Sequence, residues 1–254
     1  MAVSLKNISK SEVKPPRMII YGESGVGKTT FACSAPKPIV IQTEDGLGVL
    51  DVDCFPKATS FREVMESLTA LGAEEHSYKT VVIDSLDWLE PLVWSETCRR
   101  LGVDSIEAPG YGRGYVEASN VWLEFFSLIT DLRDYKKMIV IMTAHSQIVR
   151  VEAPEHPPYD RYGLKLHKRA SALAEEYSDI LGFASSKILT KVDDPKAKKQ
   201  RVRAIDGMER ILHVTTCPAY AAKNRYEIDE DIVLTKENSW EALASKIKTS
   251  KKGA

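Results

Sequence analysis

The sequence contains only four cysteines among its 254 residues, and Cys33, Cys54, Cys98 and Cys217 lie far apart in the chain. No two of them have C-x-x-C spacing, and no histidine lies near two of them in the sequence. A zinc site built on cysteine, or a disulfide framework, requires closer or denser cysteines. We therefore expect reduced thiols that are mostly buried.

A long apolar segment is also missing from the sequence. No run approaches the roughly 18 apolar residues that span a bilayer. The first residues, MAVSLKNISKSEVK, have neither the apolar centre nor the cleavage-like site of a secretory signal. These absences predict a cytoplasmic protein with no membrane partner.

The sequence lacks a large excess of either charge: it has 35 Lys and Arg residues and 36 Asp and Glu residues, and its formal net charge is -1. This balance excludes a globally basic nucleic-acid coat protein and an acidic solvating tail, but a local patch can still bind nucleic acid. The 43% of hydrophobic residues suffices for a sizeable core. No linker-like segment divides the chain, so we expect one domain.

Short apolar runs predict strands that are buried on both faces. These runs are residues 17–21, 38–42, 80–84 and 137–143. Helical patterns lie between them: one begins with the capping box Ser60 to Glu63, and another spans about 116–135. This alternation predicts an α/β fold, with a mostly parallel sheet flanked by helices.

The last third of the chain has a different pattern. Its predicted strands are residues 179–184, 186–192, 201–205 and 210–214, with a polar hairpin loop at 193–200. A short helix capped by Ser239 follows, with Trp240, Leu243 and Ile247 facing inward. The predicted organisation is a flexible arm (1–16), one domain (17–247) with a core at about 17–184 and a β-rich extension at about 185–247, and a basic tail (248–254).

The most specific motif follows the first predicted strand. Residues 22–29, GESGVGKT, match the phosphate-binding pattern G-x-x-x-x-G-K-S/T in full, between a strand and a helix. Gly22 and Gly27 let the backbone approach a phosphate closely, and loop N–H groups with the helix N-terminus attract it. Lys28 can reach the β- and γ-phosphates, and the Thr29 hydroxyl can ligate Mg²⁺. We therefore predict ATP and Mg²⁺ as cofactors. The expected nucleotide contacts are Gly22, Glu23, Ser24, Gly25, Val26, Gly27, Lys28, Thr29 and Thr30.

Acidic residues end two of the predicted strands. Asp84 closes an apolar strand, where P-loop enzymes hold magnesium, usually through water. Hydrolysis also needs a group that orients the attacking water, and Ser85 rather than a glutamate follows Asp84. Glu44 is our candidate because catalytic groups gather at the carboxyl ends of strands in an open α/β sheet. Asp45 is its rival.

These features follow the order found in a known family. The phosphate loop, Glu44, Asp84 and a polar residue after the fourth strand resemble the RecA-like recombinase ATPases. They more closely resemble the short phage-encoded RecA-like ATP-binding proteins, some of which act in single-strand annealing. The resemblance spans about residues 17–184, and residues 218–226 are similar to a segment of the phage group. It implies that Glu44 polarises water and that His145 or Gln147 senses the γ-phosphate. Of these two we choose His145, and the implied catalytic set is Glu44, Lys28 and His145.

The resemblance also implies a function. The protein would be a DNA-stimulated ATPase that acts on single-stranded DNA in phage-type homologous recombination or strand annealing, in the host cytoplasm if it is phage-encoded. It would assemble into a homo-oligomeric ring or filament, and a single-strand-binding protein could be its partner.

Two segments combine mobile glycines or prolines with aromatic and basic residues, a mixture that suits single strands. In residues 106–115 the candidate DNA contacts are Tyr111, Arg113 and Tyr115, and in a loop at 150–169 they are Arg161 and Lys165. Both segments could instead be surface loops or contact another subunit. Lys165, Lys168 and Arg169 could also reach a neighbour's γ-phosphate as trans fingers.

A basic cluster and two other functions remain as alternatives. The cluster, either a solvated face or a second DNA-tracking surface, comprises Lys196, Lys198, Lys199, Arg201 and Arg203. The chain could be a P-loop switch or loader that binds a protein of the replication or recombination machinery. A small-molecule phosphoryl transferase would need an acceptor pocket or lid arginines, and we identify neither in the sequence.

Overall fold

The computed structural model describes residue 8 and residues 12–192, 202–235 and 239–247. The strands are β1 (Arg17–Gly22), β2 (Pro38–Gln42), β3 (Asp53–Cys54), β4 (Thr80–Asp84), β5 (Ile139–Ala153), β6 (His156–Leu164), β7 (Ile180–Val192), β8 (Val202–His213), β9 (Lys223–Asn224) and β10 (Ile232–Leu234). The helices are α1 (Lys28–Cys33), α2 (Phe61–Ala73), α3 (Leu86–Leu101), α4 (Arg113–Asp134), α5 (Lys168–Tyr177) and α6 (Ser239–Ala244).

A twisted sheet forms the centre of the molecule, in the strand order β10-β8-β7-β1-β5-β4-β2-β3. Its middle is parallel: β1 pairs with β5 and β7, and β4 pairs with β5 and β2. The antiparallel pairs lie at its periphery, where β8 joins β7 and β10, and where β6 joins the far end of β5. The fold class is therefore confirmed: a mostly parallel α/β sheet with a β-rich C-terminal extension.

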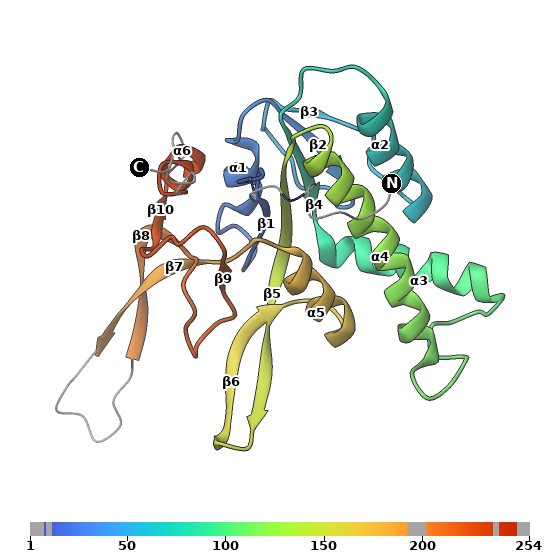
Figure 1. Cartoon of the computed structure of the whole chain (residues 1–254). Coiled ribbons are helices and arrows are strands. Elements are labelled where there is room, and N and C mark those ends of the chain that lie inside the picture. Colours follow the sequence, from blue (N-terminus) through green and yellow to red (C-terminus); the bar gives the residue numbers. More distant parts are fainter. Residues whose placement is uncertain (1–7, 9–11, 193–201, 236–238, 248–254) are drawn as a thin grey trace.

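Helices cover both faces of this sheet (Figure 1). On β1, Ile19 and Tyr21 face a core shared with α2, α3, α4 and α5, whereas Met18 and Ile20 face a second core shared with α1 and α6. Successive side chains of a strand point to opposite faces, so a strand between two helical layers must be apolar throughout. This requirement explains why the four apolar runs marked β1, β2, β4 and the parallel first part of β5.

The fifth strand is the largest departure from the predicted elements. Residues 137–143 predict a short strand, but β5 starts at Ile139 and continues to Ala153. Its second half leaves the parallel sheet and pairs with β6 in an antiparallel hairpin. The segment predicted as a loop at 150–169 is therefore mostly strand, followed by the first residues of α5. Figure 1 shows the β5–β6 hairpin projecting below the body of the sheet.

The C-terminal extension is simpler than its sequence pattern indicates. Its four predicted strands merge into two long ones, β7 and β8, which pair antiparallel with a register shift between Ser186 and Ile188. The residues at this irregularity interrupt the apolar pattern but not the strand. The predicted hairpin loop at 193–200 and the basic tail lie outside the described residues, as does most of the predicted N-terminal arm.

Two helices, α3 and α5, have no counterpart among the predicted elements. In α3, Leu89 and Val93 are buried while Trp88 is 52% exposed, so apolar residues do not mark a single face. The predicted capping of α2 is present, because the Ser60 side chain accepts a hydrogen bond from the Glu63 backbone N–H. The buried Trp240 and Leu243 attach α6 to the sheet.

All four cysteines are free thiols, but none of them is fully buried. Cys54 is exposed on the short edge strand β3, and the others are half-buried. The expectation of mostly buried thiols was therefore wrong: none of the four belongs to either core, although Cys33 packs against the core shared with α1 and α6. Burial still raises the pKa of Cys33 to about 12, so this thiol stays protonated at neutral pH.

Candidate nucleotide-binding site

The phosphate-binding motif forms the turn between β1 and α1. A side chain at Gly22 would place its Cβ 2.2 Å from the Ala184 carbonyl oxygen, and Gly27 has a φ of 99°, so both positions require glycine. The Lys28 ammonium folds back over the loop and donates hydrogen bonds to the carbonyl oxygens of Gly22 (3.1 Å) and Glu23 (2.9 Å). The loop thus holds a single lysine amine against its own concave backbone.

Lys28 is only 7% exposed, and burial lowers the pKa of its ammonium. The negative charges of Asp87, Asp84 and Glu44 act in the opposite direction. The lysine therefore faces three carboxylates from the ends of neighbouring strands and from the first turn of α3. A bound polyphosphate would replace the loop carbonyl oxygens as the partner of this ammonium.

Asp84 lies at the end of β4 and is 2% exposed. Its Oδ2 accepts a hydrogen bond from the Thr29 hydroxyl at 3.1 Å, and its Oδ1 accepts one from the Thr143 hydroxyl on β5. Two threonines from adjacent elements therefore fix the orientation of this carboxylate.

The pairing of Thr29 with Asp84 has the chemistry of a magnesium site. Mg²⁺ prefers oxygen donors and usually combines one or two protein ligands with waters and substrate phosphates. No cluster of three or more His, Cys, Asp and Glu side chains in the described part of the chain could hold a metal by itself. The hydroxyl and the carboxylate therefore fit a site that the nucleotide itself would complete.

Glu44 is the second residue of the loop after β2. This loop is tied to β4 because the backbone N–H groups of Thr43 and Glu44 both donate to the Asp84 carbonyl oxygen, at 2.8 and 3.3 Å. A methyl group on Gly46 would lie 3.3 Å from Asp84 Oδ2 and 3.7 Å from Glu44 Cγ, so both acidic side chains lie beside Gly46. The rival Asp45 instead has a side chain that is 94% exposed and lies 4.0 Å from the Lys57 ammonium.

These groups border a common cavity of about 440 Å³. The predicted residues that line it are Gly25, Gly27, Lys28, Thr29, Thr30, Glu44, Asp84 and His145. The cavity therefore brings together the phosphate loop, both acidic candidates and the chosen γ-phosphate sensor, as the parallel order of β1, β5, β4 and β2 requires.

His145 and Gln147, the two candidate sensors, have different surroundings. His145 pairs in register with Gly22, and Asp87 accepts from its backbone N–H and contacts its ring Nδ1, both at 2.9 Å. Gln147 lies two residues further along β5 and donates its amide to the carbonyl oxygens of Leu164 (2.9 Å) and Leu166 (3.1 Å). His145 borders the 440 Å³ cavity, whereas Gln147 anchors the returning strand of the hairpin.

The DNA candidates before and within α4 divide into two kinds. Tyr111 and Arg113 are exposed. Tyr115 stacks on the ring of His167, with centroids 4.1 Å apart, and its hydroxyl donates to Glu107 at 3.0 Å. The face of Tyr115 toward His167 is therefore already covered within the chain.

The basic candidates of the second segment also differ in their contacts. Arg161 is half-buried on β6, and its Nε makes no hydrogen bond to any described residue. The Lys165 backbone N–H donates to the His145 carbonyl oxygen at 2.9 Å, and its ammonium lies 3.9 Å from Asp87. Lys168 and Arg169 are exposed in the first turn of α5.

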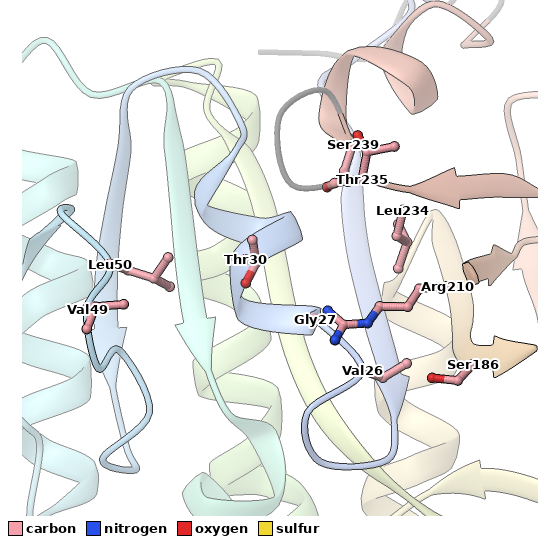
Figure 2. Close-up of a pocket in the computed structure, with 10 residues that line it drawn as sticks. All are labelled: Val26, Gly27, Thr30, Val49, Leu50, Ser186, Arg210, Leu234, Thr235 and Ser239. Carbon is pink, nitrogen blue, oxygen red and sulfur yellow. The ribbon is translucent and has the colours of Figure 1, made fainter. Parts of the chain in front are cut away.

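Sequence reasoning missed Arg210. This residue is on β8, more remote in the chain than any other residue of the site, and its guanidinium lies against the phosphate loop (Figure 2). Its Nη1 would be 3.3 Å from a Cβ placed on Gly27. Nothing in a strand pattern marks such a contact. In the predicted basic cluster, residues 196–201 lie outside the described residues and the side chain of Arg203 is not described.

The fold and the site together define a P-loop ATPase. The model of the AAA domain family matches residues 14–226, and the chain belongs to this family. No curated protein matches the chain. Among solved structures, the crystal structure of the RadB recombinase is similar, with a TM-score of 0.49 and 12% sequence identity over 89% of this chain and 90% of that chain. None of the helices in the described part is long and apolar enough to cross a membrane.

Proposed function

We propose that this protein hydrolyses ATP with Mg²⁺ and couples hydrolysis to single-stranded DNA in recombination or strand annealing. One observation carries the proposal: β5 passes the nucleotide cavity at His145 and then continues directly into the projecting β5–β6 hairpin. A change at the γ-phosphate side of the cavity therefore has a continuous strand along which to reach the hairpin.

In the proposed reaction each residue has a separate role. Lys28 binds the β- and γ-phosphates and offsets their charge, and Glu44 orients the attacking water and accepts its proton. Asp84 and Thr29 hold Mg²⁺, which polarises the phosphates when bound. His145 contacts the γ-phosphate, and Asp87 orients its ring.

The proposed coupling runs through Asp87. This carboxylate contacts both His145 and the Lys165 ammonium, and the Lys165 backbone is bonded to the His145 carbonyl oxygen. The two ends of the hairpin are thus held beside the sensor. Departure of the γ-phosphate would change the balance of charge around Asp87. The position of the hairpin relative to the nucleotide cavity would change with it.

The proposed DNA surface combines the hairpin with the loop before α4. These segments are linked because Tyr115, in the first turns of α4, stacks on His167, just after β6. Tyr111 can stack on bases, while Arg113 and Arg161 contact phosphates. Lys168 and Arg169 extend this surface, or reach the γ-phosphate of a neighbouring subunit in a ring or filament.

The experiment is ATP hydrolysis with and without single-stranded DNA, at low and at physiological salt. We expect DNA to stimulate turnover and the stimulation to fade as salt rises, because phosphate contacts release counterions. Equal turnover in all four conditions would reject the DNA role. It would leave the ATPase assignment intact.

A partner-binding switch is the second candidate, favoured by exposed apolar side chains beside the same elements. Tyr111 is fully exposed, Ile148 on β5 is 67% exposed and Trp88 on α3 is 52% exposed. Such side chains suit a protein contact. In the double variant Tyr111→Ala with Arg113→Ala, weaker DNA binding supports the first proposal, and unchanged DNA binding with loss of a protein contact supports the switch.

A further inference from the structure

A second cavity, of about 690 Å³, lies between the phosphate loop and the C-terminal strands (Figure 2). The two cavities adjoin, because both are lined by Gly27, Thr30, Val49, Leu50 and Arg210. The volume of the second cavity lies within the roughly 300–1,000 Å³ of small-molecule sites. A ligand at the phosphate loop can therefore extend into it.

The two cavities differ in chemistry. The smaller one is bordered by Lys28 and the carboxylates Glu44 and Asp84, which suits a polyphosphate with its metal. Among the described residues no carboxylate borders the larger one, whose walls alternate apolar side chains such as Val26 and Leu234 with hydroxyl groups. Apolar faces with a few hydroxyl groups suit an uncharged ring and its sugar.

Arg210 stands where the cavities meet. Its side chain reaches from β8 to Gly27, with Nη1 3.3 Å and Cδ 3.9 Å from a Cβ placed there (Figure 2). No hydrogen bond or ion pair joins the Arg210 side chain to another residue in the described part of the chain. A planar guanidinium binds phosphate through two parallel hydrogen bonds, and a guanidinium beside a phosphate loop is placed for that contact.

Strand register explains how a remote residue reaches this point. β7 pairs with β1 up to the match of Ala184 with Gly22, and then continues past the phosphate loop. Two residues further on, Ser186 pairs with Arg210 across the β7–β8 ladder. Their side chains therefore share one face of the extension, and both border the larger cavity.

We propose that the larger cavity holds the nucleoside of bound ATP or ADP, and that Arg210 binds the phosphate nearest to that nucleoside. The C-terminal extension thereby completes the nucleotide site of the P-loop core. This inference depends on nucleotide binding, which is one part of the proposed function, and is independent of the DNA role.

The test fills the cavity and compares nucleotides with inorganic tripolyphosphate by isothermal titration calorimetry. Ser186→Trp introduces a large side chain at an exposed strand position that borders the cavity. We expect it to weaken ATP and ADP binding at least about tenfold and to leave tripolyphosphate binding unchanged. Lys187→Trp is the matched control, because Lys187 pairs with Glu209 and does not border the cavity. We expect this control to bind all three ligands as the parent protein does.

Arg210→Ala is the second variant. We expect ATP and ADP to bind about tenfold to a hundredfold more weakly, because a charge-assisted contact to phosphate is lost. Lys187→Ala removes a cation from the same hairpin and should leave the affinities unchanged.

Three outcomes would overturn the proposal. They are full ATP affinity in Ser186→Trp, equal loss of ATP and tripolyphosphate in that variant, and full ADP affinity in Arg210→Ala. Because the readout is binding alone, absence of DNA stimulation would leave the proposal standing. A parent protein that bound no ATP would instead overturn it together with the ATPase assignment.

Discussion

At the scale of the residue, the two neighbouring acidic residues Glu44 and Asp45 have opposite surroundings. Glu44 is half-buried at the nucleotide cavity, while the Asp45 side chain is 94% exposed. The Glu44 carboxylate is thus placed where it can act in catalysis, whereas the Asp45 carboxylate is solvated.

We therefore expect Glu44→Gln to lower the turnover of ATP by about a hundredfold or more, because the group that accepts the proton of water is lost. ATP binding should remain, since Lys28 and the loop are unchanged. Asp45→Asn is the matched control and should retain turnover. Steady-state hydrolysis and nucleotide titration measure both effects, and normal turnover in Glu44→Gln would remove this residue from its role.

A second residue-scale prediction concerns Glu90 on α3, which is 7% exposed. Burial raises its pKa to about 7, the backbone N–H of His167 opposes this shift, and the charge of Asp87 adds to it. Because the folded-state pKa lies above the usual value of about 4.3, the folded state prefers the protonated form. The stability that Glu90 contributes is therefore complete below about pH 4.3 and is lost as the pH rises through about 7.

Glu90→Gln removes this titration and keeps an acceptor for the His167 N–H. We expect the free energy of unfolding of the variant, relative to the parent, to increase between pH 5 and pH 8 by roughly 1–3 kcal/mol. Urea denaturation at a series of pH values measures it. A difference that is constant with pH would show that Glu90 titrates normally.

At the scale of the element, the β5–β6 hairpin is an extension of a core strand. Its base is held by the amide of Gln147 and by the Lys165 backbone, and its tip is the turn at residues 154–155. Removing the outer part should therefore leave the nucleotide cavity intact.

Replacing residues 149–161 with Asn-Gly would close the hairpin after the pair Ile148 and Tyr162. We expect basal hydrolysis to persist, single-stranded DNA to bind about tenfold or more weakly, and its stimulation of hydrolysis to disappear. The control keeps the strands and replaces only residues 154–155 with Asn-Gly. A shortened protein that DNA still stimulated would exclude the outer hairpin from the DNA surface.

At the scale of the whole molecule, one buried carboxylate joins distant parts of the chain. Asp179, before β7, accepts hydrogen bonds from Arg17 on β1, Arg133 on α4 and Arg225 near the C-terminal strands. Burial alone would raise the pKa of Asp179, but the hydrogen bonds and charges of the arginines outweigh it and hold the pKa below its usual value. The extension is thus fastened to the core at the edge opposite the nucleotide.

We expect Asp179→Asn to lower the free energy of unfolding by about 3–5 kcal/mol, because it leaves the buried Arg17 without its counter-ion. Asp134→Asn is a matched control, since Asp134 also pairs with Arg133 but lies nearer the surface, and its cost should stay below about 1 kcal/mol. Chemical denaturation of the two variants measures the contrast. Equal costs would mean that the Asp179 cluster does not hold the molecule together.

The features that can be predicted from the sequence alone are those encoded locally. The phosphate loop is a contiguous motif, and the parallel strands are apolar runs whose carboxyl ends must meet at one edge. For that reason the order of motifs along the chain places Glu44, Asp84 and His145 beside Lys28, and all four border one cavity.

Features that depend on pairing between remote strands cannot be predicted from local sequence patterns. The continuation of β5 into a hairpin, the stacking of Tyr115 on His167 and the approach of Arg210 to Gly27 all depend on register and strand order. Side-chain periodicity records which face of an element is buried, not which partner covers it. The nucleoside side of the site therefore had no signal in the sequence, because it is built by a strand that lies far from the phosphate loop along the chain and beside it only after folding.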